Sequence, residues 1–166
     1  MGWWDCGILG GDAPLDMLGD ISDALSVPNI DEGHDEVGED YETRMLYPIE
    51  RWSDDRAKLI AKSLKKNWDK VQKVIDLYSK DKRDDDNNLV IQVVATVIMA
   101  SGAAFPRGFR PKAIKAGLND EWAKEGDERR ERILEYTKAV TDYKTGNRIV
   151  LTSEGLFSKI GKMMEG

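Results

Sequence analysis

The feature that most constrains this chain is a run of twelve almost wholly apolar residues, 89–100. Such a run has no polar side to turn towards water, so the rest of the chain must cover it on every side. Its β-branched residues favour a strand, but twelve residues are more than a strand usually holds. We therefore predict a buried central helix, capped by Asn87 or Asn88 and ended by Ser101 and Gly102. The run is far shorter than the about 20 residues of a membrane span, and we expect no membrane association.

The longest amphipathic pattern covers residues 54–79. Ser53 followed by Asp54 and Asp55 is a good helix start, because acidic side chains suit the positive end of the helix dipole. Apolar residues then recur every three or four positions along one face, and lysines dominate the remainder. That face consists of Ala57, Ile60, Leu64, Trp68, Val71, Ile75 and Tyr78. The pattern predicts one continuous helix, the longest of the chain.

Weaker signals follow the central run. Residues 105–111 contain two prolines and a glycine and are predicted to be irregular. A short helix is expected over 112–116. Another begins near Asn119 or Asp127, and its apolar face holds Ile133, Tyr136, Val140 and Tyr143.

Near the C-terminal end, Thr145, Gly146 and Asn147 predict a turn. Residues 148–152 have the composition of a brief strand, although no partner strand is evident. A last helix is expected from Ser153, burying Leu156, Phe157, Ile160 and Met163.

The N-terminal helical pattern divides into an apolar and an acidic side. Asp12 is a plausible N-cap, Pro14 fits the first turn, and Pro28 marks the end. The apolar side holds Leu15, Leu18, Ile21 and Leu25. The opposite side holds only aspartates, namely Asp12, Asp16, Asp20 and Asp23.

Together these patterns predict a mainly α fold. We expect residues 1–166 to form a compact single-domain helical bundle with a buried central helix and at most one short strand or hairpin. The helices at 54–79 and 127–144 are expected to pack around 89–100. The single cysteine, Cys6, excludes an internal disulfide and fits a reducing compartment, so the cytoplasm is the expected location.

Charge is distributed unevenly along the chain. Residues 1–50 carry 13 acidic residues and one base, Arg44, whereas the remaining 116 residues carry 24 bases and 18 acids. The two parts therefore have net charges of −12 and +6. This asymmetry is typical of an interaction surface, and it also fits two halves that attract each other.

The segment 29–50 is predicted to be a mobile acidic loop within the domain. Its carboxylates include Asp31, Glu32, Asp35, Glu36, Glu39 and Asp40, followed by Glu42. Oxygen ligands of this kind suit calcium or magnesium, but the glycine position of an EF-hand loop falls on Glu36. An enzyme that uses carboxylates and a divalent ion in this segment remains the alternative hypothesis for function.

Other catalytic signatures are scarce. The chain lacks a P-loop and a dinucleotide-binding glycine fingerprint. A Cys–His dyad would have to join Cys6 to His34, and these two residues alone do not supply the usual ligands of zinc. We expect no cofactor.

Two charged surfaces are candidates for binding. The aspartate side of the N-terminal helix is either an ordinary solvated helix face or a surface that matches a basic groove on a partner, and it would repel DNA itself. The basic side combines the lysines of 54–79 with Arg107, Arg110 and Lys112, beside Phe105 and Phe109. Interleaved arginines and aromatics can clamp nucleic acid, whereas the simpler interpretation is that these cations cover the core.

The opening residues also carry a resemblance. The stretch G-W-W-D-C-G-I-L-G-G-D-A-P-L-D-M-L-G-D-I resembles the start of a bacterial protein family of unknown function. Its Gly-Gly-Asp-x-Pro-Leu-Asp form is similar to small proteins of tailed bacteriophages, which share Asp120-Glu121-Trp122 and the sequence S-E-G-L-F at 153–157. The resemblance implies a helical fold and a phage or bacterial setting, and it supplies no catalytic residue.

From these features we expect a non-enzymatic phage accessory protein that binds a host protein, to redirect or block a defence or nucleic-acid-processing system. The contact residues would be the aspartates at 12, 16, 20 and 23 with the acidic loop at 31–40. The partner would present a basic, nucleic-acid-binding groove, and direct binding of nucleic acid through the basic side is the third hypothesis.

Overall fold

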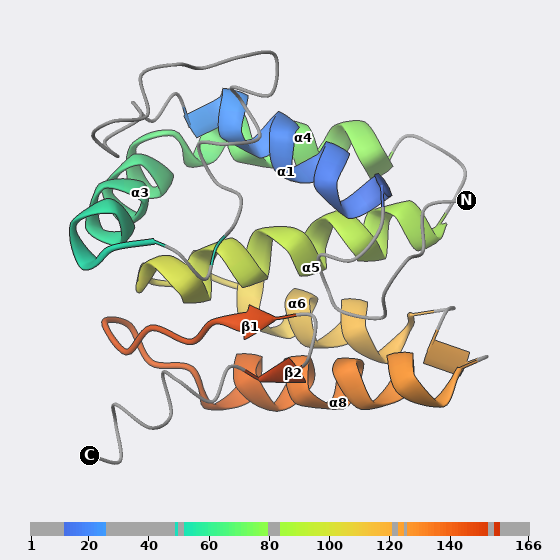
Figure 1. Ribbon diagram of the computed structural model, residues 1–166. Helices are drawn as coiled ribbons and strands as arrows, with labels where there is room; N and C mark the ends of the chain where they lie inside the picture. The colour runs from blue at the N-terminus through green and yellow to red at the C-terminus, as the bar shows by residue number, and fades with distance from the viewer. Residues whose placement is uncertain are drawn as a thin grey trace, which may run out of the picture.

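The computed structural model describes residues 12–25, 49, 52–79, 84–120, 123–124, 126–152 and 155–156. Its helices are α1 (Asp12–Leu25), α3 (Asp54–Lys66), α4 (Trp68–Ser79), α5 (Asp84–Ser101), α6 (Phe109–Leu118) and α8 (Asp127–Asp142). Two short strands follow, β1 (Leu151–Thr152) and β2 (Gly155–Leu156). The fold is a mainly α bundle, as the sequence predicted (Figure 1).

Helix α5 is the centre of the bundle. Every side chain from Leu89 to Ser101 is buried, and α5 contacts α1, α3, α4 and α6. Figure 1 shows α1, α3 and α4 covering one side of α5, with α6 and α8 on the other. The prediction of a buried central helix is confirmed, because a segment that is apolar all round is stable only when it is surrounded.

The ends of α5 were predicted with unequal success. The helix begins at Asp84 rather than after Asn87 or Asn88. Asn88 does not act as a cap, because its side-chain amide donates to the carbonyl of Asn119, 3.1 Å away. At the other end Gly102 adopts a φ of +86° and its N–H donates to Ile98 at 3.1 Å, which ends the helix as predicted.

The long helix predicted over 54–79 is wrong in its continuity. It is divided into α3 and α4 at Asn67, whose φ of −113° and ψ of 25° leave the helical region. The Asn67 amide donates to the carbonyls of Leu25 at 3.3 Å and of Ser63 at 3.2 Å. Hydrogen bonds from an asparagine side chain to nearby backbone compete with a continuous helix, and here they also join α3 to the end of α1.

The apolar face of this segment nevertheless follows the predicted periodicity across the break. Ala57, Ile60 and Leu64 in α3 are buried, as are Val71 and Ile75 in α4. The remaining two members of the face, Trp68 and Tyr78, are half-buried and pack against the core. Ser53 caps α3, since its hydroxyl accepts a hydrogen bond from the N–H of Arg56 at 3.0 Å.

On the other side of α5, α6 is longer than the 112–116 helix that the sequence predicted. It begins at Phe109, so Pro111 lies in its first turn, where a missing N–H removes no helical hydrogen bond. The buried face predicted for α8 is confirmed at Ile133, Tyr136 and Val140, with Tyr143 just beyond the helix end. However, α8 packs mainly on α6 rather than directly on the central helix.

The end of the described chain forms a small hairpin. The turn predicted at 145–147 is confirmed, with Gly146 at a φ of +90°. Strand β1 pairs antiparallel with β2, with Leu151 opposite Leu156. The helix predicted from Ser153 is therefore wrong at 155–156, and Phe157, Ile160 and Met163 lie outside the described residues.

A buried polar cluster connects three of these elements. It consists of Gln92 from α5, Asp120 after α6 and Arg129 from α8, and all three side chains are almost fully buried. Arg129 Nη2 lies 2.8 Å from Asp120 Oδ2 and donates to Gln92 Oε1 at 2.9 Å. Gln92 Nε2 donates to the same Asp120 oxygen at 2.9 Å, and the N–H of Ala123 donates to Asp120 Oδ1 at 2.7 Å.

Burial alone would raise the pKa of Asp120. The hydrogen bonds and positive charge of Arg129, with the amides of Gln92 and Ala123, outweigh that effect and hold the pKa of Asp120 below its ordinary value. The carboxylate is therefore charged in the folded protein, and every member of the cluster has a partner. Such a cluster fixes one arrangement of α5, α6 and α8, because any shift would leave a buried charge unpaired.

We expect Asp120→Asn to lower the free energy of unfolding by about 3 kcal/mol, because it removes the carboxylate that forms a buried ion pair with Arg129. The double variant Asp120→Asn/Arg129→Gln should lose less, since it leaves no buried charge. The depressed pKa of Asp120 gives stability that is present above about pH 4 and is lost as pH falls through the folded value. Urea titrations at several pH values should therefore show the gap between wild type and Asp120→Asn narrowing in acid, and a pH-independent gap would contradict this account.

The contact of α6 with α8 depends on Gly117. A Cβ at this position would lie 2.9 Å from Thr137 Oγ1 and 3.0 Å from Tyr136 Cε2. We expect Gly117→Ala to destabilise the protein by roughly 1 kcal/mol net, because overpacking outweighs the better helix propensity of alanine. Thr137→Ala in the same chain should recover part of this loss in thermal unfolding. A Gly117→Ala variant more stable than the wild type would show that the helices are less closely packed.

Candidate functional site

The acidic side of α1, defined here as Asp16, Asp20 and Asp23, is one candidate surface. The other side of the helix is buried, with exposed fractions of 1% or less at Met17, Leu18, Ile21 and Leu25. Asp16 and Asp23 are exposed, and Asp20 is half-buried. The helix that carries the predicted aspartates is thus present, with its apolar side in the core.

The remaining predicted contact residues are not described to the level of side chains. Asp12 is the first residue of α1, and its side chain lies outside what the structure describes. The loop carboxylates also lie outside the described residues, namely Asp31, Glu32, Asp35, Glu36, Glu39 and Asp40. Their part in binding stays a prediction, as does the metal-dependent alternative that relies on them.

Asp20 differs from its neighbours because it is tied to α4. The hydroxyl of Tyr78 donates to Asp20 Oδ2 at 2.6 Å, a charge-assisted hydrogen bond between half-buried groups. α1 and α4 are in contact and lie side by side in Figure 1. The aspartates are therefore not a uniformly solvated stripe, since the middle one is part of the contact between two helices.

The C-terminal end of α1 is also held in place. Its last carbonyl, that of Leu25, accepts hydrogen bonds from Ser63 Oγ at 2.6 Å and from Asn67 Nδ2 at 3.3 Å. These bonds satisfy one of the carbonyls that every helix leaves without an internal partner. With the bond to Tyr78, they fix α1 on α3 and α4 at two places, so the acidic side has a defined orientation.

The predicted basic side is only partly available. The lysines at 58, 62, 65, 66, 70 and 73 are exposed, as are Arg107 and Lys112. Arg110, by contrast, stacks over the ring of Phe105 with its Cζ 4.9 Å from the centroid, and donates to the carbonyl of Val140. Phe109 is buried. Arg110 and Phe109 make these contacts within the fold, and direct binding of nucleic acid through the basic side stays a hypothesis.

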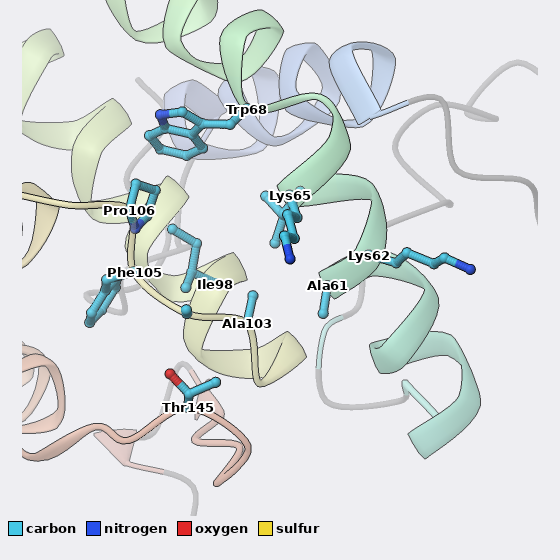
Figure 2. A pocket seen from close by; sticks show the side chains of 11 residues that line it. Ala61, Lys62, Lys65, Trp68, Ile98, Ala103, Phe105, Pro106 and Thr145 are labelled. Atoms are coloured by element: carbon cyan, nitrogen blue, oxygen red, sulfur yellow. The ribbon is translucent and has the colours of Figure 1, made fainter.

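A second candidate surface was not foreseen from the sequence. It is a cavity of about 510 Å³, here called the α3–α5 groove. One wall is formed by α3, through Ala61, Lys62, Leu64 and Lys65, and by Trp68 of α4. The rest of the lining comes from Ile98 of α5, the segment 103–106 and Thr145. Figure 2 shows these side chains around the open space between α3 and the 103–106 segment.

The wall formed by 103–106 is held by contacts on its far side. Phe105 packs against Phe109 with ring centroids 5.8 Å apart and against Tyr143 at 5.2 Å. The Tyr143 hydroxyl donates to the carbonyl of Ala103, and burial raises the pKa of Tyr143, so the phenol stays protonated. Trp68 meets Phe109 edge to face at 5.5 Å. Both walls of the groove are thus joined through Phe109.

The groove offers mainly alkyl and aromatic surface. Its polar members are the Lys62 and Lys65 ammonium groups and the Thr145 hydroxyl. Lys65 extends into the open space in Figure 2, whereas Lys62 points away from it. Such a lining binds an apolar group that carries negative charge beside it, and it places no carboxylate, imidazole or thiol from the described residues where catalysis would need one.

Two further findings concern the described part of the chain. Within 12–25, 52–79, 84–120 and the later described segments, no three His, Cys, Asp or Glu side chains are grouped so as to hold a metal ion. None of the helices formed by those residues is long and apolar enough to cross a bilayer. The Cys6–His34 pair lies outside them.

Comparison with protein-family models, with curated proteins and with solved structures found no match for this chain. The function of the chain is therefore inferred from the two surfaces themselves.

The sequence contains a signal for the groove beside the apolar face predicted over 54–79. Ala61, Lys65 and Trp68 recur at steps of four and three, and thus form a stripe beside the buried face. Phe105 and Pro106 follow the helix-ending Gly102 by a few residues, which brings them back beside α3. What the sequence could not supply was the angle between α3 and α4, which determines whether the space is filled.

The Tyr78–Asp20 bond gives a test of how α1 is held. We expect Tyr78→Phe to lower the free energy of unfolding by about 1–2 kcal/mol, because a hydrogen bond to a charged, half-buried carboxylate is lost. In a double-mutant cycle with Asp20→Asn, measured by urea denaturation, the two losses should not be additive. Fully additive losses would show that the bond does not contribute in solution.

Proposed function

We propose that this protein is a non-enzymatic accessory protein of a bacteriophage that binds a host protein through the acidic side of α1. The observation that supports this most directly is the fixed presentation of that side. Asp16 and Asp23 are exposed on a helix whose apolar side is buried and whose Asp20 and Leu25 are tied to α3 and α4. The phage setting is supported by the resemblance of the opening residues.

Fixed orientation matters for affinity. A binding surface that is already ordered loses less conformational entropy when the complex forms than a mobile charged segment does. Because α1 is held at Asp20 and at Leu25, its exposed carboxylates keep their spacing in the free protein. The surface therefore has the properties expected of an electrostatic contact rather than of a merely soluble helix face.

The chemistry of this surface defines the partner. Asp16 and Asp23 are seven residues apart, which is about 10 Å along a helix, so their carboxylates follow one line. A line of negative charges matches a groove lined with lysine or arginine, as found in proteins that bind nucleic-acid backbones. The proposed partner is a host protein with such a groove, and binding would block its access to nucleic acid.

The test is affinity capture of the tagged protein from a bacterial host lysate, at low and at moderate salt, with quantitative mass spectrometry. Asp16→Asn/Asp23→Asn should fold normally, because exposed substitutions usually change stability by less than about 0.5 kcal/mol. We expect it to retain about three- to tenfold less of the partner, since each exposed charge pair contributes about 0.2–1 kcal/mol. Binding by the wild type should weaken as salt rises.

A matched control removes two acids elsewhere. Glu131 and Asp142 are exposed on α8, at the opposite side of α5 from α1 (Figure 1). Glu131→Gln/Asp142→Asn changes the net charge equally and should capture the partner as the wild type does. Equal capture by both double variants would remove the acidic side of α1 from the contact, and capture of no stoichiometric partner at either salt would overturn the proposal.

A further inference from the structure

We infer that the α3–α5 groove is a second binding site, which takes a short amphipathic helix of a partner protein with acidic residues beside its apolar face. The site shares no residue with the acidic side of α1, and its charge is of opposite sign. The inference goes beyond the proposed function, because it names a different surface and a different ligand chemistry.

The lining of the groove identifies the apolar part of the ligand. A cavity of about 510 Å³ lies within the usual range of about 300–1,000 Å³ for ligand sites. The apolar surface of the groove comes from four large side chains, those of Leu64, Trp68, Ile98 and Phe105. The small side chains of Ala61 and Ala103 leave space between them. Apolar side chains of a partner would fill this space and remove the apolar lining from water.

The lysines identify the charge of the ligand and its arrangement. Lys62 and Lys65 are exposed and lie three residues apart on α3, which is about 4.5 Å along the helix axis. Lys65 extends into the groove, whereas Lys62 points outward from the same helix (Figure 2). Acidic residues beside the apolar face of a bound helix can meet Lys65 within the groove and Lys62 at its edge, whereas a fatty acid with one terminal carboxylate would meet a charge at one end only.

The borders of the groove favour a helix over an extended peptide. Its lining comes from helices α3, α4 and α5, from 103–106 and from Thr145, and none of these belongs to a strand. An extended peptide therefore has no sheet edge to join. The stripe from Ala61 to Trp68 covers seven steps, about 10 Å or two helical turns, which is the length over which helical anchors at i, i+3 or i+4, and i+7 recur.

The groove is also ordered before binding. The 103–106 wall is held by Tyr143 and Phe109, and the N–H of Gly146 donates to the carbonyl of Gly102 at 2.9 Å. Arg148 Nε donates to Ala100 at 2.6 Å, and its Nη1 lies 2.9 Å from Asp54 Oδ1 at the start of α3. Arg148 thus joins the end of α5 to the start of α3, and a groove whose surrounding elements are already fixed loses less entropy on binding.

The experiment uses the full chain and a designed, fluorescein-labelled helical peptide with leucine at i, i+3, i+4 and i+7 and glutamate at the exposed positions. A second peptide has lysine in place of each glutamate. We expect the glutamate peptide to bind about tenfold more tightly, because charge complementarity discriminates between them. In ¹⁵N–¹H NMR spectra, shifts should concentrate at 61–68, 98, 103–105 and 145.

Two variants of the protein separate the apolar and the charged contributions. Ala61→Trp places an indole in the groove and should abolish binding of the glutamate peptide. Lys62→Gln/Lys65→Gln changes exposed side chains only, so it tests the site even where the tryptophan variant does not fold. It should weaken binding about fivefold, as two exposed charge pairs would. The matched control Lys70→Gln/Lys73→Gln on α4 should change binding less than about twofold.

Three outcomes would overturn the inference: equal binding of the two peptides, undiminished binding by a folded Ala61→Trp variant, or tighter binding of dodecanoate than of the glutamate peptide at the same resonances. The last outcome would identify a site for a single-chain amphiphile. Asp16→Asn/Asp23→Asn should bind the glutamate peptide like the wild type. Failure of the groove is thereby distinguished from failure of the proposed contact at α1.

Discussion

The whole fold depends on covering α5 from every side. Its consecutive buried residues from Leu89 to Ser101 leave no direction in which the helix can face water, so one layer of helices cannot be enough. α1, α3 and α4 form one cover and α6 with α8 the other. This arrangement also places the Gln92 amide within the core, where an unpaired polar group would be costly. Asp120 and Arg129 supply the hydrogen-bond partners of the Gln92 amide, and their ion pair fixes α6 and α8 relative to α5.

The groove follows from the way the first cover is built. α5 has 18 residues, whereas α3 and α4 have 13 and 12, so covering its length takes both helices and a junction between them. At the junction, the side-chain amide of Asn67 donates a hydrogen bond to the carbonyl of Leu25. This bond satisfies a carbonyl at the end of α1 and stabilises the break between α3 and α4. The lining of the groove comes from both sides of the junction, since it includes Leu64 before it and Trp68 after it. Leu64 and Trp68 are four residues apart, the spacing of neighbours on one helix face, so the apolar face continues across the junction into the groove.

Sequence reasoning succeeded where one periodicity decides the structure. The apolar run at 89–100 predicted a buried helix, and the faces of 12–25, 54–79 and 127–142 were identified because each must turn one side to the core. Sequence reasoning failed where a hydrogen bond or ion pair between residues far apart in the sequence determines the structure. Nothing local indicates that Asn67 would bind the end of α1, or that Asp120 and Arg129 would meet Gln92 in the core. The exposed aspartates of α1 were found because they lie on one side of one helix, whereas the groove needs residues from three helices and a loop.

A neutral group holds the middle aspartate of the acidic side at the contact between α1 and α4. Asp20, the aspartate of α1 that lies between α1 and α4, is bound by the neutral hydroxyl of Tyr78 and not by a lysine of that helix. The lysines of α3 and α4 meanwhile remain exposed. An exposed ion pair at this contact would have stabilised the helices by only about 0–1 kcal/mol, so folding loses little by using a neutral donor at Asp20. The exposed carboxylates of α1 and the exposed lysines of α3 and α4 thus give the same helical layer two surfaces of opposite sign, and such surfaces suit partners of opposite charge.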